Sequence, residues 1–341
     1  MIEKVAMGKS GWMNKILRWR PFRIFKIMLM RLVLPGFDGI PLYNVLIFFG
    51  RSLAKGALTQ RAAAISFNFF LALFPAILFF FTLIPYIPIE NFQATLMMLI
   101  EDTVPSSTYQ TIETTLTEII ILPHDGLMSL GFFMALFFAT NGFKSIMTAF
   151  ETSYYGDEQR AFIKTQFVAI FLLVITVLVT TITIGLITFN RVFLDFLIEY
   201  SFFKDDKFYY YLIYSINVLL QLAMIFFVVS FIYYYAPINR KQYRFISVGS
   251  TFATVLYIFS FIAFDQYITH FSTYNVLYGS IGTLIIILMW IYLNSIVLLI
   301  GFELNASIKT VRKSDLFSIF RHKKELKDMN KKLKKEGKLG N

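Results

Sequence analysis

Six long apolar runs alternate with polar segments along the chain, near residues 63–86, 127–147, 166–189, 208–235, 245–266 and 279–302. Each run is long enough to cross about 30 Å of hydrocarbon as an α-helix. All six are expected to be helical, because an isolated span has to satisfy its own backbone hydrogen bonds. The pattern predicts an all-α, polytopic membrane protein with six transmembrane helices.

The distribution of Lys and Arg predicts the side of the membrane on which each connecting segment lies. Segments 1–62, 144–165 and 236–244 and the tail after the sixth run hold eleven, three, three and twelve of the 32 basic residues. The intervening segments hold the other three. Cytoplasmic loops carry the excess of Lys and Arg, so both termini are expected in the cytoplasm. Because the first 60 residues are basic, we expect no cleavable signal.

The chain divides into three regions. Residues 1–62 are a basic segment, in which residues 13–32 predict an amphipathic helix on anionic headgroups and Leu42–Gln60 predicts a short helix before the first span. Residues 63–308 are the six-helix transmembrane domain. Residues 309–341 form a Lys-rich tail, for which both a frayed helix and a disordered segment are consistent with the composition.

The segment 87–126 between the first two spans carries six acidic residues and no basic one. Apolar residues recur there at helical spacing on both sides of the sequence VPSS. This predicts an outer amphipathic helical hairpin hinged at VPSS, with Ser106 or Ser107 as a helix cap. Such a hairpin could rest on the membrane surface or cover the mouth of a cavity.

Composition supports the membrane assignment and narrows the chemistry. The chain is 57% apolar and 16% charged, below the roughly one quarter of charged residues in globular proteins. It has no cysteine, which excludes disulfides and thiolate metal sites. The histidines are His124, His270 and His322, far apart and without a His-x-His or His-Glu-x-x-His pattern. We therefore expect no metal, no cofactor and no enzymatic activity.

Four of the predicted spans contain an amide side chain, and a polar group in hydrocarbon is costly unless it finds a partner. A proline in the first span is expected to kink that helix and to leave the carbonyl of Leu71 without its usual donor. Such amides could line a substrate path. Alternatively, they could only form hydrogen bonds between helices, each worth about 0.6 to 2 kcal/mol. The candidate substrate path consists of Asn68, Pro75, Asn141, Asn217, Gln221, Asn294 and Asn305.

Two carboxylates are candidates for ion coupling: Glu303 at the end of the sixth span and Asp265 at the outer end of the fifth. At 100° per residue, Asn294 and Asn305 share one stripe of the sixth span, whereas Glu303 falls on the opposite face. The amide and the carboxylate are therefore expected to address different neighbours, with Asn294 meeting an amide of the first or fourth span. For Glu303 the alternative is a snorkelling carboxylate or a partner of a nearby Arg or Lys.

Four stretches resemble the YihY/BrkB family of bacterial inner-membrane proteins. They are "RAAAISFNFFLALFPAILFFF" at the first span, "FETSYYGDEQRAFIKTQF" after the second, "YYYAPINRKQYRFISVGSTFAT" before the fifth and "FSTYNVLYGSIGTLIIILMWIYLNSIVLLIGFELNASI" through the sixth. The resemblance covers most of residues 55–308. It implies six spans with cytoplasmic termini in the bacterial inner membrane. Family members have been labelled ribonuclease BN, but this chain lacks the clustered ligands that a metal-dependent nuclease needs.

Two function classes follow from these observations. The first is a transporter or flippase of a lipid or cell-envelope precursor, which draws on the intramembrane amides and on the family's link to the cell envelope. The second is a non-transporting membrane scaffold that acts through its basic cytoplasmic segments, with anionic headgroups as partners. Membrane lipids are the expected partners in both classes. Nucleic acid is not expected, because the Lys-rich tail has few aromatic residues for base stacking.

Overall fold

The computed structural model describes residues 27–37, 39–55, 57–88, 91–103, 113–114, 117–118, 122–153, 160–199, 206–238, 243–270 and 280–335. Its helices are α3 (Leu42–Lys55), α4 (Leu58–Leu83), η2 (Ile84–Tyr86), α5 (Phe92–Thr103), α7 (Asp125–Ser153), α8 (Phe162–Glu199), α9 (Asp206–Tyr235), α10 (Val248–His270) and α12 (Ser280–Lys335). The described part of the chain contains no strand. The all-α prediction is confirmed.

Six helices are long and apolar enough to cross a membrane, as the sequence predicted: Leu58–Tyr86, Asp125–Thr152, Phe162–Asn190, Tyr214–Tyr235, Val248–Thr269 and Gly282–Arg312. The first begins five residues earlier than expected, because Ala57 adopts a left-handed conformation (φ 44°) and starts the new helix there. Arg61 thereby becomes part of the first span.

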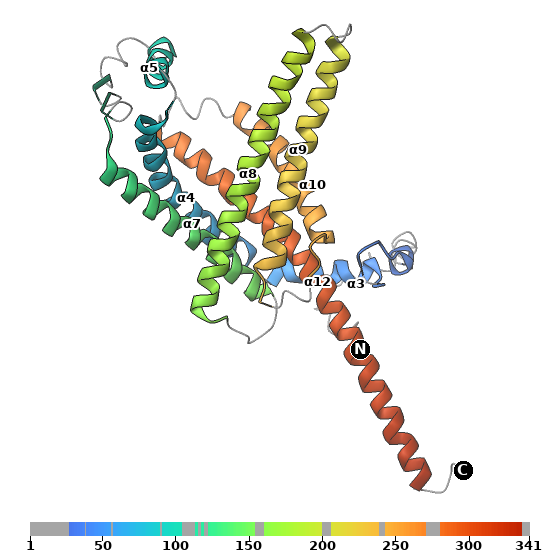
Figure 1. Ribbon diagram of the computed structural model, residues 1–341. Helices are drawn as coiled ribbons and strands as arrows, with labels where there is room; N and C mark the ends of the chain where they lie inside the picture. The colour runs from blue at the N-terminus through green and yellow to red at the C-terminus, as the bar shows by residue number, and fades with distance from the viewer. Residues whose placement is uncertain are drawn as a thin grey trace.

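The segments before and after the spans join the bundle in different ways. The predicted helix near Leu42–Gln60 is present as α3, which ends at Lys55, before the turn at Ala57. After the sixth span the chain does not leave its helix, and α12 continues to Lys335. Figure 1 shows this extension projecting well beyond the other helices.

Two expected elements fall largely outside the described residues. Of the amphipathic helix expected at 13–32, the structure describes only 27–32, with residues 27–31 helical. Of the outer hairpin, the first half is present as α5, whereas the VPSS hinge and its caps lie outside the described residues. The hairpin therefore stays a prediction.

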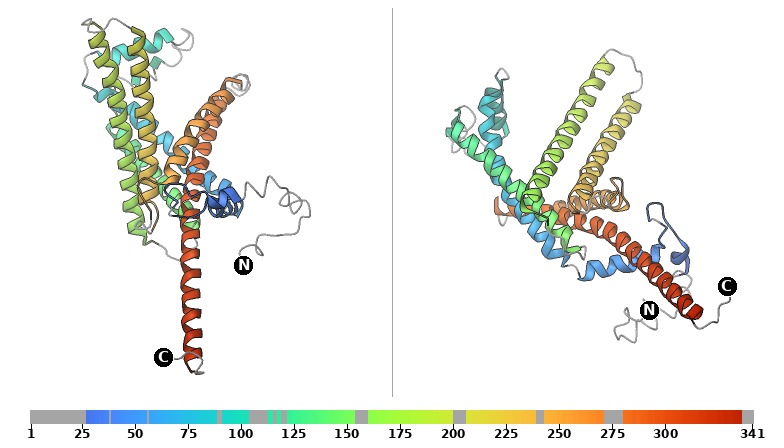
Figure 2. Two further views of the ribbon diagram at one scale, coloured as in Figure 1. Left: turned by 90° about the vertical axis from the view of Figure 1, so that its right-hand side faces the viewer. Right: turned by 60° about the horizontal axis from the view of Figure 1, so that its bottom comes forward.

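The spans pack as sequential antiparallel pairs, α4 with α7, α8 with α9 and α10 with α12. We call the end of the bundle that carries α3, Phe150 and Phe302 the basal end, and the end that carries η2 and α5 the distal end. Toward the distal end, the α4–α7 pair and the α8–α9 pair diverge (Figures 1 and 2). Helix α12 crosses the middle and contacts α3, α4, α7 and α10.

An aromatic cluster holds the basal end together. The rings of Phe150 and Phe302 stack with centroids 3.7 Å apart, and the edge of Tyr233 meets both rings. Tyr233 is fully buried, and its hydroxyl donates to the carbonyl of Leu298 at 2.6 Å. Tyr243 extends the stack against Phe302, under the ammonium of Lys309. Helices α7, α9 and α12 are thereby joined by direct contact between aromatic side chains.

Helices α10 and α12 approach closely through small residues, which are Gly249 and Ala253 of α10 and Gly301 of α12. A side-chain carbon at Gly249 would collide with the carbonyl oxygen of Gly301, and one at Gly301 would lie 2.6 Å from the Cβ of Ala253. Asn305 caps the start of α10, because its Oδ1 accepts from the Gly249 amide and its Nδ2 donates to Ser247 Oγ, both at 2.8 Å.

Candidate functional site: an intramembrane cavity

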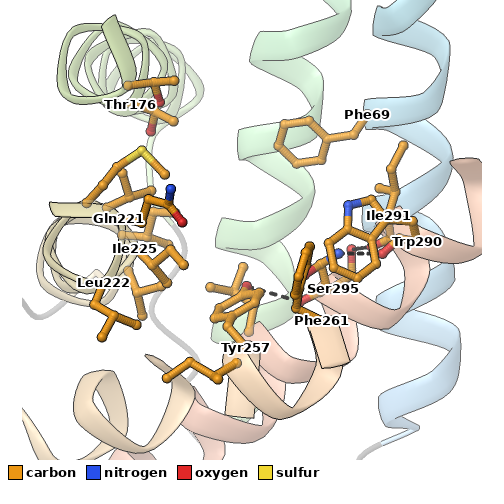
Figure 3. Close-up of a pocket in the computed structure, with 18 of the residues that line it drawn as sticks. Phe69, Thr176, Gln221, Leu222, Ile225, Tyr257, Phe261, Trp290, Ile291 and Ser295 are labelled. Atoms are coloured by element: carbon orange, nitrogen blue, oxygen red, sulfur yellow. Dashed lines mark hydrogen bonds between the residues drawn. The ribbon is translucent and has the colours of Figure 1, made fainter. Parts of the chain in front are cut away.

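A cavity of about 680 Å³ lies within the transmembrane domain, and every span contributes to its wall. Pockets of roughly 300 to 1,000 Å³ are the usual size of small-molecule sites. Figure 3 shows side chains of α8 and α9 facing those of α4, α10 and α12 across this space. The cavity thus occupies the space between the diverging helix pairs, with the basal aromatic cluster at one end.

The wall is mainly apolar, with a small set of polar groups. Ile65 and Phe69 of α4, Phe143 and Ile146 of α7 and Phe261 of α10 represent the apolar part. The polar and amphipathic members are Thr176, Thr180, Tyr214, Gln221, Tyr257, Trp290, Asn294 and Ser295. Such a wall suits an amphipathic molecule with a long hydrocarbon part and few hydrogen-bonding groups.

Asn294 lines the cavity from α12, on the face that the sequence predicted. Its Nδ2 donates to the carbonyl of Trp290 in the same helix at 2.6 Å, and its backbone carbonyl accepts from Tyr257 Oη of α10 at 3.1 Å. The prediction that Asn294 meets an amide of the first or fourth span was wrong. Its side chain instead donates to the carbonyl of Trp290, which lies one turn away in the same helix. Gln221 of α9 also reaches this space (Figure 3).

Glu303 lies on the opposite face of α12, as the helical angle predicted, and is fully buried. Arg61 of α4 donates from Nη2 to Glu303 Oε1 at 2.6 Å and from Nη1 to the carbonyl of Ala149 at 2.8 Å. Ser52 of α3 donates to the other carboxylate oxygen. The structure therefore contains an ion pair between Glu303 and a nearby Arg, which was the alternative expected for this carboxylate. With the contacts to Ser52 and to the carbonyl of Ala149, the pair joins α3, α4, α7 and α12.

A separate polar groove of about 370 Å³ runs between α4 and α7. Asn68 and Asn141 of the candidate path line this groove and not the cavity. Asn68 Nδ2 donates to Ser145 Oγ at 2.9 Å, and Lys144 Nζ donates to Asn141 Oδ1 at 3.1 Å. These amides thus hold side chains of the α4–α7 pair in place.

The remaining candidates line neither space. Asn217 of α9 accepts from Asn190 of α8 at 2.9 Å, which is an interhelical packing contact. Asn305 caps α10, and Pro75 lies inside α4, which runs unbroken from Leu58 to Leu83. The side chain of Asp265 is exposed near the distal end, at the other end of the bundle from Glu303.

Sequence reasoning missed two sets of residues. Tyr257 and Phe261 continue the four-residue series that begins with Gly249 and Ala253, so a longer reading of that stripe could have found them. Lys144 was counted with the basic segment 144–165, where it overlapped the end of the expected run 127–147, and the structure places it inside the second span, three residues after Asn141. Among the described residues, no group of three or more His, Cys, Asp or Glu could hold a metal ion.

Comparisons with known proteins place the chain among membrane proteins. A family model described as virulence factor BrkB matches residues 50–325. YfkH of Bacillus subtilis, whose name calls it ribonuclease-like, is 29% identical over 258 residues, which cover 74% of this chain and 91% of YfkH. No solved structure matches the chain.

Shorter matches connect the chain to proteins named UPF0761 membrane proteins. The one from Pseudoalteromonas translucida is 39% identical over 77 residues, or 23% of this chain and 26% of that protein. The one from Idiomarina loihiensis is 34% identical over 87 residues, or 26% of this chain and 30% of that protein. These matches agree with the six apolar helices of the structure.

Proposed function

The chain belongs to the virulence factor BrkB family, and we propose that this multi-pass membrane protein is a transporter or flippase of a lipid or cell-envelope precursor. The observation that carries the proposal is the 680 Å³ cavity walled by all six spans. Its long apolar wall fits a hydrocarbon chain, and the amides of Gln221 and Asn294 offer hydrogen bonds to a polar group.

Transport across a bilayer requires that such a cavity open to one side at a time. The stacked rings of Phe150 and Phe302, with Tyr233 against both, close the basal end. At the distal end the α4–α7 and α8–α9 pairs diverge (Figure 2). In the proposed cycle these two pairs move relative to each other, and the aromatic cluster separates when the basal end opens.

The proposal places the basal end in the cytoplasm of a bacterium, with both termini there and the protein in the inner membrane. The support is the Lys and Arg excess in the segments at that end. The natural chain has no cysteine, so Thr95→Cys of α5 and the exposed Ile246→Cys provide single labelling sites. An impermeant maleimide should label only the first in intact spheroplasts and only the second in inverted vesicles. The reverse pattern would contradict this orientation.

Energy coupling through Glu303 is not part of the proposal. A fully buried carboxylate that accepts from Arg61 and Ser52 is more suited to holding helices together than to exchanging protons with water. We also propose that the protein is not an enzyme, because its three histidines are widely separated in sequence. The ribonuclease-like name is that of YfkH.

A matched pair of threonines on α8 tests whether the cavity holds a lipid. Thr180 lines the cavity, whereas its neighbour Thr181 is exposed on the outer surface. Thr180→Phe should fill the space with a ring, and Thr181→Phe should add the same ring where lipid already surrounds the helix. Native mass spectrometry of the detergent-released proteins then identifies the lipids that remain bound.

The proposal predicts one lipid class enriched over the bulk membrane in the natural protein and in Thr181→Phe, and lost in Thr180→Phe. Lipids identical in composition to the bulk membrane, and the same in all three proteins, would contradict it. That second result would favour the scaffold, whose working parts are the basic segments outside the bundle.

A further inference from the structure

The groove between α4 and α7 is polar along a surface that faces away from the cavity. Seven of its nine lining residues are polar, and the other two are alanines that keep it open: Arg61, Ala64, Asn68, Asn141, Lys144, Ser145, Thr148, Ala149 and Thr152. On α7 the cavity is lined by Phe143 and Ile146, which lie on a different face from Lys144 and Thr148. The two spaces are therefore distinct sites on the same helix pair.

Arg61 and Lys144 are the cations of the groove. Glu303 compensates the charge of Arg61, at 2.6 Å. Among the described residues, Lys144 Nζ contacts neutral groups: it donates to Asn141 Oδ1 at 3.1 Å and lies 5.6 Å from the ring centre of Phe162. The groove as a whole therefore carries an excess of positive charge at Lys144.

The position of Lys144 along the membrane makes this charge significant. Lys144 is nine residues before the end of α7 at Ser153, which corresponds to about 13 Å at helical rise. The polar headgroup region of a bilayer is only about 5 to 8 Å thick on each side. With the end of α7 taken as the membrane surface, Lys144 lies below the headgroups, where an ammonium is costly unless an anion accompanies it. The exposed Ala64 and Thr148 leave the groove open to the surrounding lipid.

We propose that this groove binds the phosphate of an anionic membrane lipid, which enters sideways from the bilayer. Lys144 supplies the charge, and the hydroxyl of Thr148, which is exposed in the groove, can donate to a phosphate oxygen. The acyl chains of the lipid then lie against the apolar outer surfaces of α4 and α7, where Phe67 and Phe137 are exposed. This site does not depend on transport through the cavity.

Charge removal at Lys144 gives the direct test, with a matched lysine as control. Lys144→Gln removes the charge and keeps a side-chain N–H donor, on a chain one atom shorter. Lys164→Gln removes an exposed charge near the start of α8, at the same basal end of the bundle. Ala64→Leu is a second variant that fills the groove without changing its charge. Native mass spectrometry of each purified protein, titrated with dioleoylphosphatidylglycerol, measures the bound fraction.

We expect Lys144→Gln to raise the Kd for phosphatidylglycerol about tenfold, the effect of one lost charge-assisted contact. Ala64→Leu should weaken binding as well, whereas Lys164→Gln should bind like the natural protein. Equal weakening by Lys144→Gln and Lys164→Gln would overturn the site, since it would indicate general attraction to basic residues. Displacement of the lipid by excess inorganic phosphate would overturn the lipid as the ligand and favour a soluble phosphate. Thr180→Phe should bind phosphatidylglycerol at the groove like the natural protein, because Thr180 lines the cavity and not the groove. The groove can therefore be tested even if the transport proposal fails.

Discussion

At the scale of single residues, Glu303 and Asn294 show how neighbours decide what a polar side chain in a membrane does. Both lie on α12, nine residues apart and on opposite faces. Glu303 accepts hydrogen bonds from Arg61 and Ser52, and the guanidinium of Arg61 compensates its charge. The side-chain amide of Asn294 donates to Trp290 of its own helix, so this amide remains at the cavity wall without joining two spans.

Removing the charge of Glu303 should destabilise the protein strongly. Glu303→Gln leaves the nearly buried Arg61 without its counter-charge, and breaking one partner of a buried pair costs about 3 to 5 kcal/mol. Reversible SDS unfolding in mixed micelles measures the free energy of unfolding. The double variant Arg61→Gln, Glu303→Gln should recover part of the loss, and the exposed Glu101→Gln should change little. Equal stability of Glu303→Gln and the natural protein would show that the pair does not hold the helices together.

At the scale of elements, the contact between α10 and α12 positions the cavity wall. The stripe Gly249, Ala253, Tyr257 and Phe261 runs along one side of α10. Its first two members let the backbone approach Gly301, and its last two line the cavity. The close approach at one end of the helix thus brings Tyr257 within hydrogen-bond distance of the carbonyl of Asn294.

Adding one methyl group at Gly249 should therefore disturb this contact. The new carbon of Gly249→Ala collides with the carbonyl oxygen of Gly301, which is backbone and cannot rotate away. Overpacking of this kind costs about 1 to 3 kcal/mol. Gly185→Ala in α8 is the matched control, because nothing lies within 4 Å of a side-chain carbon there. We expect a lowered thermal unfolding midpoint for Gly249→Ala and an unchanged or raised one for Gly185→Ala, because Ala is the better helix former. Equal midpoints for the two variants would refute the close packing.

At the scale of the whole molecule, the number and approximate limits of the spans could be predicted from the sequence, because each depends only on a local run of apolar residues. The faces of Asn294 and Glu303 followed from helical periodicity alone. The cavity could not be predicted, since it depends on how far the α4–α7 and α8–α9 pairs diverge, and divergence is set by packing between distant segments. The partner of Glu303 remained open for the same reason: Arg61 is 242 residues away in the chain.

Movement of a lipid through the cavity is the central claim, and a transport assay in proteoliposomes tests it most directly. Tail-labelled fluorescent phosphatidylglycerol and phosphatidylethanolamine are reconstituted with the natural protein, Thr180→Phe or Thr181→Phe, with and without a pH gradient. Dithionite added outside then quenches every label that reaches the outer leaflet. The proposal predicts faster quenching of the inner-leaflet label with the natural protein and with Thr181→Phe, and a return to the protein-free rate with Thr180→Phe. Quenching of both lipids at the protein-free rate, or equal acceleration by all three proteins, would contradict transport through this cavity.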